Sequence, residues 1–170
     1  MDSDAARRCL DLDAIHQLKA RYCRFIDTKQ FDGLRGLFMP DARFDGLGSA
    51  PTGATVDMFV NGISTRLAPV ISIHHCHMPE IVFTGPDSAR GIWAMMDYLE
   101  WPEGAGPHEA QGYRGFTGYG HYEEEYQRAA DGWRIAFLRL TRLRIDPLAT
   151  PAPPNPRKLL AHAPGWLAGA

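Results

Sequence analysis

The chain has 170 residues, which is the usual size of one domain and enough to bury a substantial core. Hydrophobic residues make up 45% of it and charged residues 22%, which are ordinary globular values. With 18 basic and 20 acidic residues, the net charge of −2 provides no positive surface for nucleic acid or an anionic membrane. This composition predicts a soluble globular protein with neither nucleic acid nor membrane as a partner.

The cysteines and the N-terminal residues indicate the cellular compartment. The three cysteines, Cys9, Cys23 and Cys76, are an odd number without the spacing of a disulfide framework, which favours a reducing environment. Residues 1–8 are polar and lack the apolar stretch of a secretory signal. No apolar run approaches the roughly 20 residues that span a bilayer. We therefore expect a cytoplasmic protein.

Helical patterns occupy the first part of the chain. Residues 11–27 show one broad apolar face, and a second short helix is expected over residues 31–38, ended by Pro40. A third helix is expected over residues 56–67, with Thr55 as its N-cap. On the first helix, the basic residues predicted to lie off the apolar face are Lys19, Arg21 and Arg24.

The second part of the chain has the pattern of strands. Residues rich in β-branched and aromatic side chains predict strands at 70–78, 80–84, 89–101, 113–128 and 133–145, after a short one at 42–44. Helices followed by long antiparallel strands predict an α+β fold, in which a curved sheet wraps around the N-terminal helices and leaves a closed-end pocket.

Three further segments complete this organisation. Residues 1–9 are expected to be a flexible N-terminus, 10–146 the folded domain, and 147–170 a proline-rich tail. The Gly/Pro-rich insertion at residues 101–112 is expected to form a mobile flap. The face of the sheet away from the helices draws on strands as apolar as 91–99 and 133–143. Because monomers seldom expose large apolar patches, we expect a homo-oligomer.

Two residues of the first helix are candidates for chemistry. Tyr22 lies on its apolar face, where either a core tyrosine or a pocket tyrosine is consistent with the pattern. Asp27 lies at its C-terminal end, where the helix macrodipole disfavours a negative charge. Asp27 is therefore either a functional carboxylate or the first residue of a capping box for the next helix, in Asp27-Thr28-Lys29-Gln30.

The segment Ser72-Ile73-His74-His75-Cys76-His77-Met78-Pro79 places three histidines in one strand. Alternation puts His75 and His77 on one face and His74 and Cys76 on the other. Only two ligands can then point the same way, whereas zinc sites use three or four. Phosphate loops, dinucleotide fingerprints and HExxH motifs are also absent from the sequence. We therefore expect neither a metal nor an organic cofactor.

Two charged residues interrupt apolar strands. Asp97 shares one face with Trp93, Met95 and Leu99, which favours an inward carboxylate with a partner. Arg139 interrupts the apolar run 135–143. By contrast, His121 and the run Glu123–Glu125 are interpreted as structural or solvated residues.

These residues, in this order, resemble the SnoaL-like superfamily, which includes scytalone dehydratase, bile-acid 7α-dehydratase, hexachlorocyclohexane dehydrochlorinase and polyketide cyclases. The resemblance covers roughly residues 10–146. The matching motifs are Leu18-Lys19-Ala20-Arg21-Tyr22…Ile26-Asp27, Leu37-Phe38-Met39-Pro40-Asp41-Ala42, His75…Met78-Pro79-Glu80-Ile81 and Gly132-Trp133-Arg134-Ile135…Arg139-Leu140…Arg144.

The resemblance implies a nuclear-transport-factor-like cone and a catalytic pair of Asp27 with His75. In the dehydratase and dehydrochlorinase branches, an aspartate at the end of the first helix hydrogen-bonds a strand histidine that acts as the base. Tyr22, Asp97 and Arg139 resemble the further site residues of the bile-acid dehydratase. Cys76-His77 departs from the small residues frequent at those positions, which leaves His74 as the alternative to His75. The resemblance also implies a homotrimer, with a homodimer as the alternative.

Together these observations predict a cofactor-free lyase of dehydratase type. His75 would remove a proton next to a carbonyl group, Asp27 would orient it, and Tyr22 would donate a hydrogen bond to the substrate. Arg139 would stabilise negative charge or orient Asp97. The expected substrate is an apolar, polycyclic carbonyl compound. The alternatives are an isomerase or polyketide cyclase with the same base, and a member that binds small molecules without catalysis.

Overall fold

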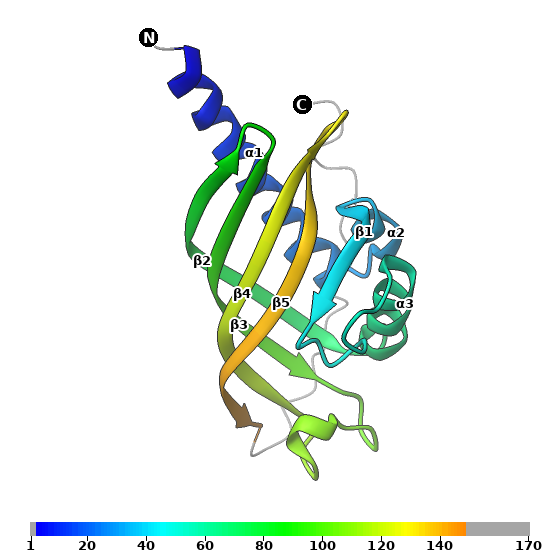
Figure 1. The fold of residues 1–170 in the computed structure, drawn as a ribbon. Helices are drawn as coiled ribbons and strands as arrows, with labels where there is room; N and C mark the ends of the chain where they lie inside the picture. Colours follow the sequence, from blue (N-terminus) through cyan, green and yellow to red (C-terminus); the bar gives the residue numbers. More distant parts are fainter. Residues whose placement is uncertain (1–2, 149–170) are drawn as a thin grey trace.

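The computed structural model describes residues 3–148, which form one curled sheet and the helices that cover it (Figure 1). The proline-rich tail predicted from residue 147 lies outside the described residues from position 149 onward. In chain order the elements are α1 (Ser3–Asp27), α2 (Phe31–Arg35), β1 (Phe38–Asp45), α3 (Val56–Leu67), β2 (Ile71–Gly85), β3 (Ser88–Glu100), the 3-10 turn η1 (His108–Ala110), β4 (Gly115–Ala129) and β5 (Gly132–Pro147).

The five strands form one sheet in the order β1-β5-β4-β3-β2. Strands β2 to β5 pair antiparallel with their neighbours, and β1 joins β5 in parallel. The sheet curls around α1, while β1, α2 and α3 lie together at one end (Figure 1). The expected α+β fold, with a curled sheet and N-terminal helices, is confirmed. We call the face toward α1 the inner face and the opposite one the outer face.

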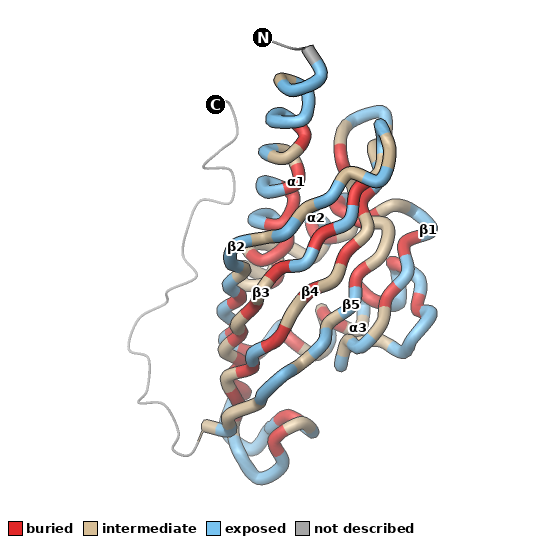
Figure 2. Tube along the Cα trace, turned by 60° about the vertical axis from the view of Figure 1, so that its left-hand side comes forward, coloured by how far each residue is buried: buried red, intermediate tan, exposed pale blue. Residues whose placement is uncertain are grey.

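The core lies between α1 and the inner face. Burial alternates along each strand, so that inward residues are buried and outward ones are partly or fully exposed (Figure 2). Helix α1 contributes Ile15, Leu18, Tyr22 and Ile26, each at most 3% exposed. At the β1–α3 end, the ring of Phe44 stacks on that of Phe59 at 4.4 Å. The inner face is thus filled by large side chains, except where the pocket described below opens.

The helices differ from the sequence-based expectation mainly at their ends. Helix α1 begins at Ser3, so it includes most of residues 1–9, which had been expected to be flexible. Helix α2 ends at Arg35, before the expected end at residue 38, and Pro40 lies within β1. An edge strand tolerates proline, because the backbone positions on its unpaired side need no N–H to bind a neighbouring strand. The Thr55 cap is confirmed, since the Thr55 hydroxyl accepts a hydrogen bond from Met58 N at 3.2 Å.

Several bulges interrupt the strands, and two of them decide which candidate residues face inward. In β2, the pairing with β3 shifts between His77 and Glu80, where Met78 adopts a positive φ of 31°. The two strands predicted at 70–78 and 80–84 are therefore one bulged strand. In β5, Tyr126 pairs with Ile135 and Glu125 with Phe137, so Ala136 is an extra residue. A bulge reverses the alternation beyond it.

No helix among residues 3–148 combines the length and the apolar character needed to cross a membrane.

Candidate functional site

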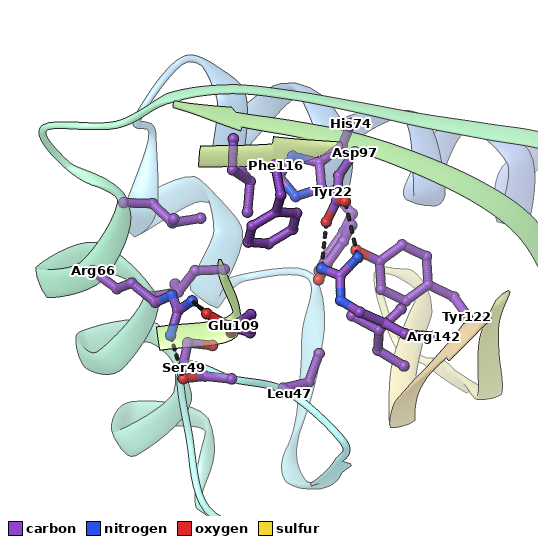
Figure 3. Close-up of a pocket in the computed structure, with 15 residues that line it drawn as sticks. Tyr22, Leu47, Ser49, Arg66, His74, Asp97, Glu109, Phe116, Tyr122 and Arg142 are labelled. Carbon is purple, nitrogen blue, oxygen red and sulfur yellow. Dashed lines mark hydrogen bonds and ion pairs between the residues drawn. The ribbon is translucent and has the colours of Figure 1, made fainter. Parts of the chain in front are cut away.

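A cavity of about 50 Å³ lies between the inner face of the sheet, α1, α3 and the two long loops (Figure 3). Its polar lining comes from elements far apart in the sequence: α1, α3, β2, β3, η1, β4 and β5. The polar side chains that line it are Tyr22, Ser49, Arg66, His74, Asp97, Glu109, Tyr122 and Arg142. Apolar side chains such as Leu99 and Phe116 complete the wall. Ligand sites typically have this combination of apolar walls with a few convergent polar groups.

Asp27 at the end of α1 holds His74 by two hydrogen bonds. The His74 backbone N–H donates to Asp27 Oδ2 at 2.7 Å, and Nδ1 lies 2.6 Å from Oδ1. Strand β2 lies at the edge of the sheet, so the backbone N–H groups along its unpaired side have no neighbouring strand to bind. Asp27 accepts a hydrogen bond from one of them, that of His74. Because a carboxylate only accepts, Nδ1 carries the proton and Nε2 keeps the lone pair in the neutral ring.

The partner of Asp27 is therefore His74, and the expected contact with His75 is wrong. His75 is exposed on the outer face, where its ring lies 6.0 Å from that of His77. The side chain of His74 is only 6% exposed and lines the cavity. The capping alternative for Asp27 is also excluded, since the N-cap of α2 is Gln30, without a side-chain cap.

Asp97 lies in the cavity wall with an arginine as its partner. Trp93, Met95, Asp97 and Leu99 are all at most 5% exposed on the inner face, as the alternation predicted. Arg142 binds Asp97 with both terminal nitrogens, at 2.9 and 2.6 Å. Burial, the largest effect, lowers the pKa of Arg142, but the Asp97 carboxylate raises it more, so the net pKa is raised. The cavity thus contains a permanently charged guanidinium.

Arg139 does not belong to this site, which corrects the sequence-based prediction. Its guanidinium bonds Glu123 at 2.5 Å on the outer face, and its side chain is 45% exposed. The bulge at Ala136 explains the difference. Alternation counted from Trp133 and Ile135 would place residue 139 inward, whereas the extra residue turns Leu138, Leu140 and Arg142 inward instead.

Tyr22 and Tyr122 present buried phenols to the cavity. Both line it, both are at most 2% exposed, and their rings meet edge to face at 5.7 Å. Burial raises the pKa of Tyr22 well above its usual value, with a further contribution from the charge of Glu124. Burial likewise raises the pKa of Tyr122. Both phenols therefore stay protonated at physiological pH and can donate hydrogen bonds.

Behind these tyrosines lies a buried polar network that the sequence patterns did not predict. Lys19, expected off the apolar face, is 1% exposed and forms an ion pair with Glu124, expected to be structural or solvated. The ammonium lies 4.2 Å from the centre of the Tyr22 ring and 3.6 Å from that of Tyr122. Tyr126 donates to Glu124 and accepts from Trp93 at 2.7 Å. This network supports the two phenols from the side away from the cavity.

Arg66 on α3 closes the opposite side of the cavity. Its guanidinium bonds both carboxylate oxygens of Glu109 at 2.6 Å and donates to the carbonyl of Gly48 at 2.9 Å. It thereby joins the loop before α3 to the loop that contains η1 (Figure 3). We call this contact set the Arg66 clasp. A cavity of 50 Å³ holds little more than one or two waters, so an organic ligand requires part of the lining to move.

No group of three or more His, Cys, Asp or Glu side chains within residues 3–148 is arranged to hold a metal ion.

The sequence patterns missed Arg142, Tyr122 and the Arg66 clasp. Regular alternation along β5 places Arg142 on the outer face, and the bulge turns it inward. Tyr122 lies on the inner face of β4, as do Glu124 and Tyr126. An inward count along β4 from Phe116 would have found Tyr122, since 116, 122, 124 and 126 have the same parity and are all buried. The clasp joins segments more than 40 residues apart and has no local signal.

Comparison with known proteins gives the family. The family model described as a SnoaL-like domain matches residues 7–139, which is most of the chain. The chain belongs to this SnoaL-like family. A protein of Gibberella zeae named as a probable cyclase is 31% identical over 141 residues, covering 76% of this chain and 89% of that protein.

Solved structures with the same fold include two from named enzymes or candidate enzymes. A type 2 hexachlorocyclohexane dehydrochlorinase superimposes with a TM-score of 0.73 at 20% identity, covering 88% of this chain and 96% of that one. A candidate scytalone dehydratase from Novosphingobium aromaticivorans gives a TM-score of 0.72 at 14% identity, over 87% and 94% of the two chains. At these identities the likeness concerns the fold.

Proposed function

We propose that this SnoaL-like protein is an enzyme that removes a proton next to a carbonyl group with His74 as the general base. The observation that carries the proposal is the double hydrogen bond from His74 to Asp27, since it fixes one tautomer of a cavity histidine. Nε2 has no partner among the described side chains and so is left to accept the proton. Asp27 then stabilises the imidazolium that forms.

The other polar groups of the cavity suit the charge that develops in such a reaction. Removal of the proton moves negative charge onto the carbonyl oxygen, and Tyr22 or Tyr122 can donate a hydrogen bond to it. The Arg142 guanidinium, held by Asp97, supplies positive charge within the same walls. These groups need no metal or organic cofactor for this step, because imidazole supplies the base and the phenols supply the donors.

Elimination of water or another leaving group is the outcome we propose, which makes the protein a lyase of dehydratase type. A protonated His74 or a tyrosine hydroxyl can give the proton that the departing hydroxyl needs. The substrate class proposed is an apolar carbonyl compound, because six apolar side chains line the cavity: Leu47, Ile63, Leu67, Leu99, Phe116 and Leu140. Polycyclic compounds would have to displace part of this lining before they bind.

The second candidate is a cyclase or isomerase that uses the same base without expelling a group. It is favoured by the Gibberella zeae relative, which is named as a cyclase. The two candidates share the first step and differ in what the carbanion-like intermediate does next.

The test is proton exchange in heavy water, which does not require the natural substrate. A panel of β-hydroxy ketones with one to three fused rings is incubated with the protein, and deuterium at the α-carbon is followed by NMR. We expect exchange that Asp27→Asn slows by about 10²- to 10⁴-fold. Asp32→Asn, an exposed aspartate of α2, serves as the matched control and should not slow it.

The products of the same incubation separate the candidates. A mass loss of one water identifies a lyase, and an unchanged mass with a shifted double bond or new ring identifies an isomerase or cyclase. Exchange no faster than in buffer across the panel, or unaffected by Asp27→Asn, would contradict both catalytic proposals and leave a binding protein.

A further inference from the structure

Two cysteines meet beside the Asp27–His74 pair, on the side of α1 and β2 that faces a surface groove. Cys23 Sγ and Cys76 Sγ lie 3.5 Å apart, and both thiols are free. Cys23 precedes Asp27 by one turn of α1, and Cys76 follows His74 by two residues on the same face of β2. The thiol pair therefore joins the same two elements as the Asp27–His74 contact.

We propose that Cys23 and Cys76 form an oxidation site, which a peroxide converts into a reversible disulfide between α1 and β2. A disulfide needs about 2.05 Å between the sulfurs, so closure requires a movement of only about 1.5 Å from the 3.5 Å contact. Nothing in this proposal depends on what the cavity binds or converts.

An oxidant can reach the pair. Both cysteines line a groove of about 620 Å³ at the edge of the sheet, together with His16, Lys19 and Trp93. Cys76 is the more accessible sulfur, since it is partly exposed while Cys23 is buried. This accessibility assigns the first step, attack on the peroxide, to Cys76 and the second step to Cys23.

The electrostatics of the pair support the same order. A hydrogen bond from the Cys23 thiol lowers the pKa of Cys76, against the effect of burial, and the nearby Lys19 ammonium lowers it further. The pKa of Cys23 is raised by that same hydrogen bond and by burial. Reaction with peroxide requires the thiolate, which Cys76 reaches more readily.

The chemistry balances with hydrogen peroxide as the oxidant. The Cys76 thiolate attacks one peroxide oxygen, the O–O bond breaks, and Cys76 sulfenic acid forms as the first water leaves with the thiol proton. Cys23 then attacks the sulfenic sulfur, loses its own proton and releases the second water. Two electrons pass from the two sulfurs to the peroxide. An added thiol reductant returns the disulfide to two thiols by thiol–disulfide exchange and is itself oxidised.

The test uses the 170-residue chain with Cys9→Ser, which removes the exposed third thiol. After hydrogen peroxide and alkylation, trypsin should release a linked pair of peptides, residues 22–24 joined to residues 67–90, two hydrogens lighter than the separate peptides. Dithiothreitol should abolish the link. In the Cys9→Ser/Cys23→Ser variant, Cys76 has no resolving thiol, and dimedone should label it as the sulfenic acid.

The folded state is tested by thermal unfolding of the same sample before and after oxidation. A link across the 52 residues between the two cysteines should raise the unfolding midpoint by roughly 5–10 °C. A Cys76 sulfinic acid with Cys23 still free, a link between two chains, or no reaction at millimolar peroxide would each overturn the proposal. So would a link that forms only in urea, because the pair would then not be preorganised in the fold.

Discussion

The inner and outer faces of the sheet carry histidine and arginine residues in different environments. On β2, His74 faces inward to Asp27 and His75 faces outward to solvent. On β5, Arg142 faces inward to Asp97, and Arg139 faces outward to Glu123. Both sequence-based choices, His75 and Arg139, fell on the outer face. The difference shows that residue type and approximate position identify the strand that carries a functional residue. Which of two neighbouring residues of the same type lines the cavity depends on the face that each occupies.

Replacing each of the two histidines in turn by glutamine should give the largest difference in activity between the two faces. His74→Gln removes the proposed base, and we expect α-proton exchange in heavy water to fall by about 10²- to 10⁴-fold. His75→Gln alters only an exposed ring and should leave the exchange rate within a factor of two or so of the unmodified protein. Circular dichroism of both variants checks that the fold persists. Equal loss in the two variants would remove the distinction between the faces.

The two arginines give the next contrast, in stability rather than rate. Arg142→Met leaves the carboxylate of Asp97, which is 1% exposed, without its partner. Removing one member of a buried pair in this way should lower the free energy of unfolding by about 3 kcal/mol. Arg139→Met breaks a pair that solvent already screens, and we expect no measurable change. Urea denaturation at pH 7 measures both, and similar losses would contradict the assignment of the faces.

These contrasts also show what the sequence could predict. Periodicity found the helices, the long strands and the inward set of Trp93, Met95, Asp97 and Leu99, because β3 is regular over that stretch. The family resemblance predicted the fold, and the position of Asp27 at the end of α1 identified it as a candidate. Each of these signals is local or follows a strict period.

The misassigned residues lie on the two bulged strands. Counting back from Ile81 and Phe83, which pack against the core, strict alternation would turn His75 inward. The shift between His77 and Glu80 reverses this and turns His74 inward. Ala136 has the same effect on Arg139 and Arg142. A bulge adds one residue without a composition signal, so its position follows from pairing with the next strand and not from the strand's own sequence.

The outer face itself suggests a third test. Ile73, Val82 and Ile92 are 43%, 65% and 43% exposed there. A hollow of about 520 Å³ on this face is lined by Val82, Ile92 and Phe137 together with charged side chains, among them Arg43, Glu80, Arg90, Glu123, Glu125 and Arg139. We propose that copies of the chain cover this face, as a trimer. Light scattering should then give three times 18.9 kDa. Ile92→Arg should reduce the mass to that of one chain, whereas Met58→Arg on α3 should not. A mass near 18.9 kDa for the unmodified protein would contradict the proposal.

The smallest expected effect concerns an ammonium group next to the Asp27–His74 pair. Lys29, just after α1, donates to the hydroxyl of Ser72 on the inner face of β2 at 2.7 Å. Burial lowers its pKa from 10.5 to about 8, although the charge of Asp27 acts in the opposite direction. The outward arginine Arg139 shows the reverse, since Glu123 raises its pKa. Direct pairing with a carboxylate decides the direction and not the face, since the inward Arg142, which binds Asp97, also has a raised pKa.

Lys29 should therefore make stability depend on pH in one defined window. Below pH 8 the lysine is charged in both the folded and the unfolded chain, so the cost of burying the ammonium is fully present. Between pH 8 and about 10.5 the unfolded chain binds more protons than the folded one, so this cost is relieved as pH rises. The relevant quantity is the unfolding midpoint of the unmodified protein minus that of Lys29→Met, because the subtraction removes the titration of the buried tyrosines. This difference should rise between pH 7.5 and 9.5 by about 1–3 °C. A flat or falling difference would show that the Lys29 ammonium remains solvated beside Asp27.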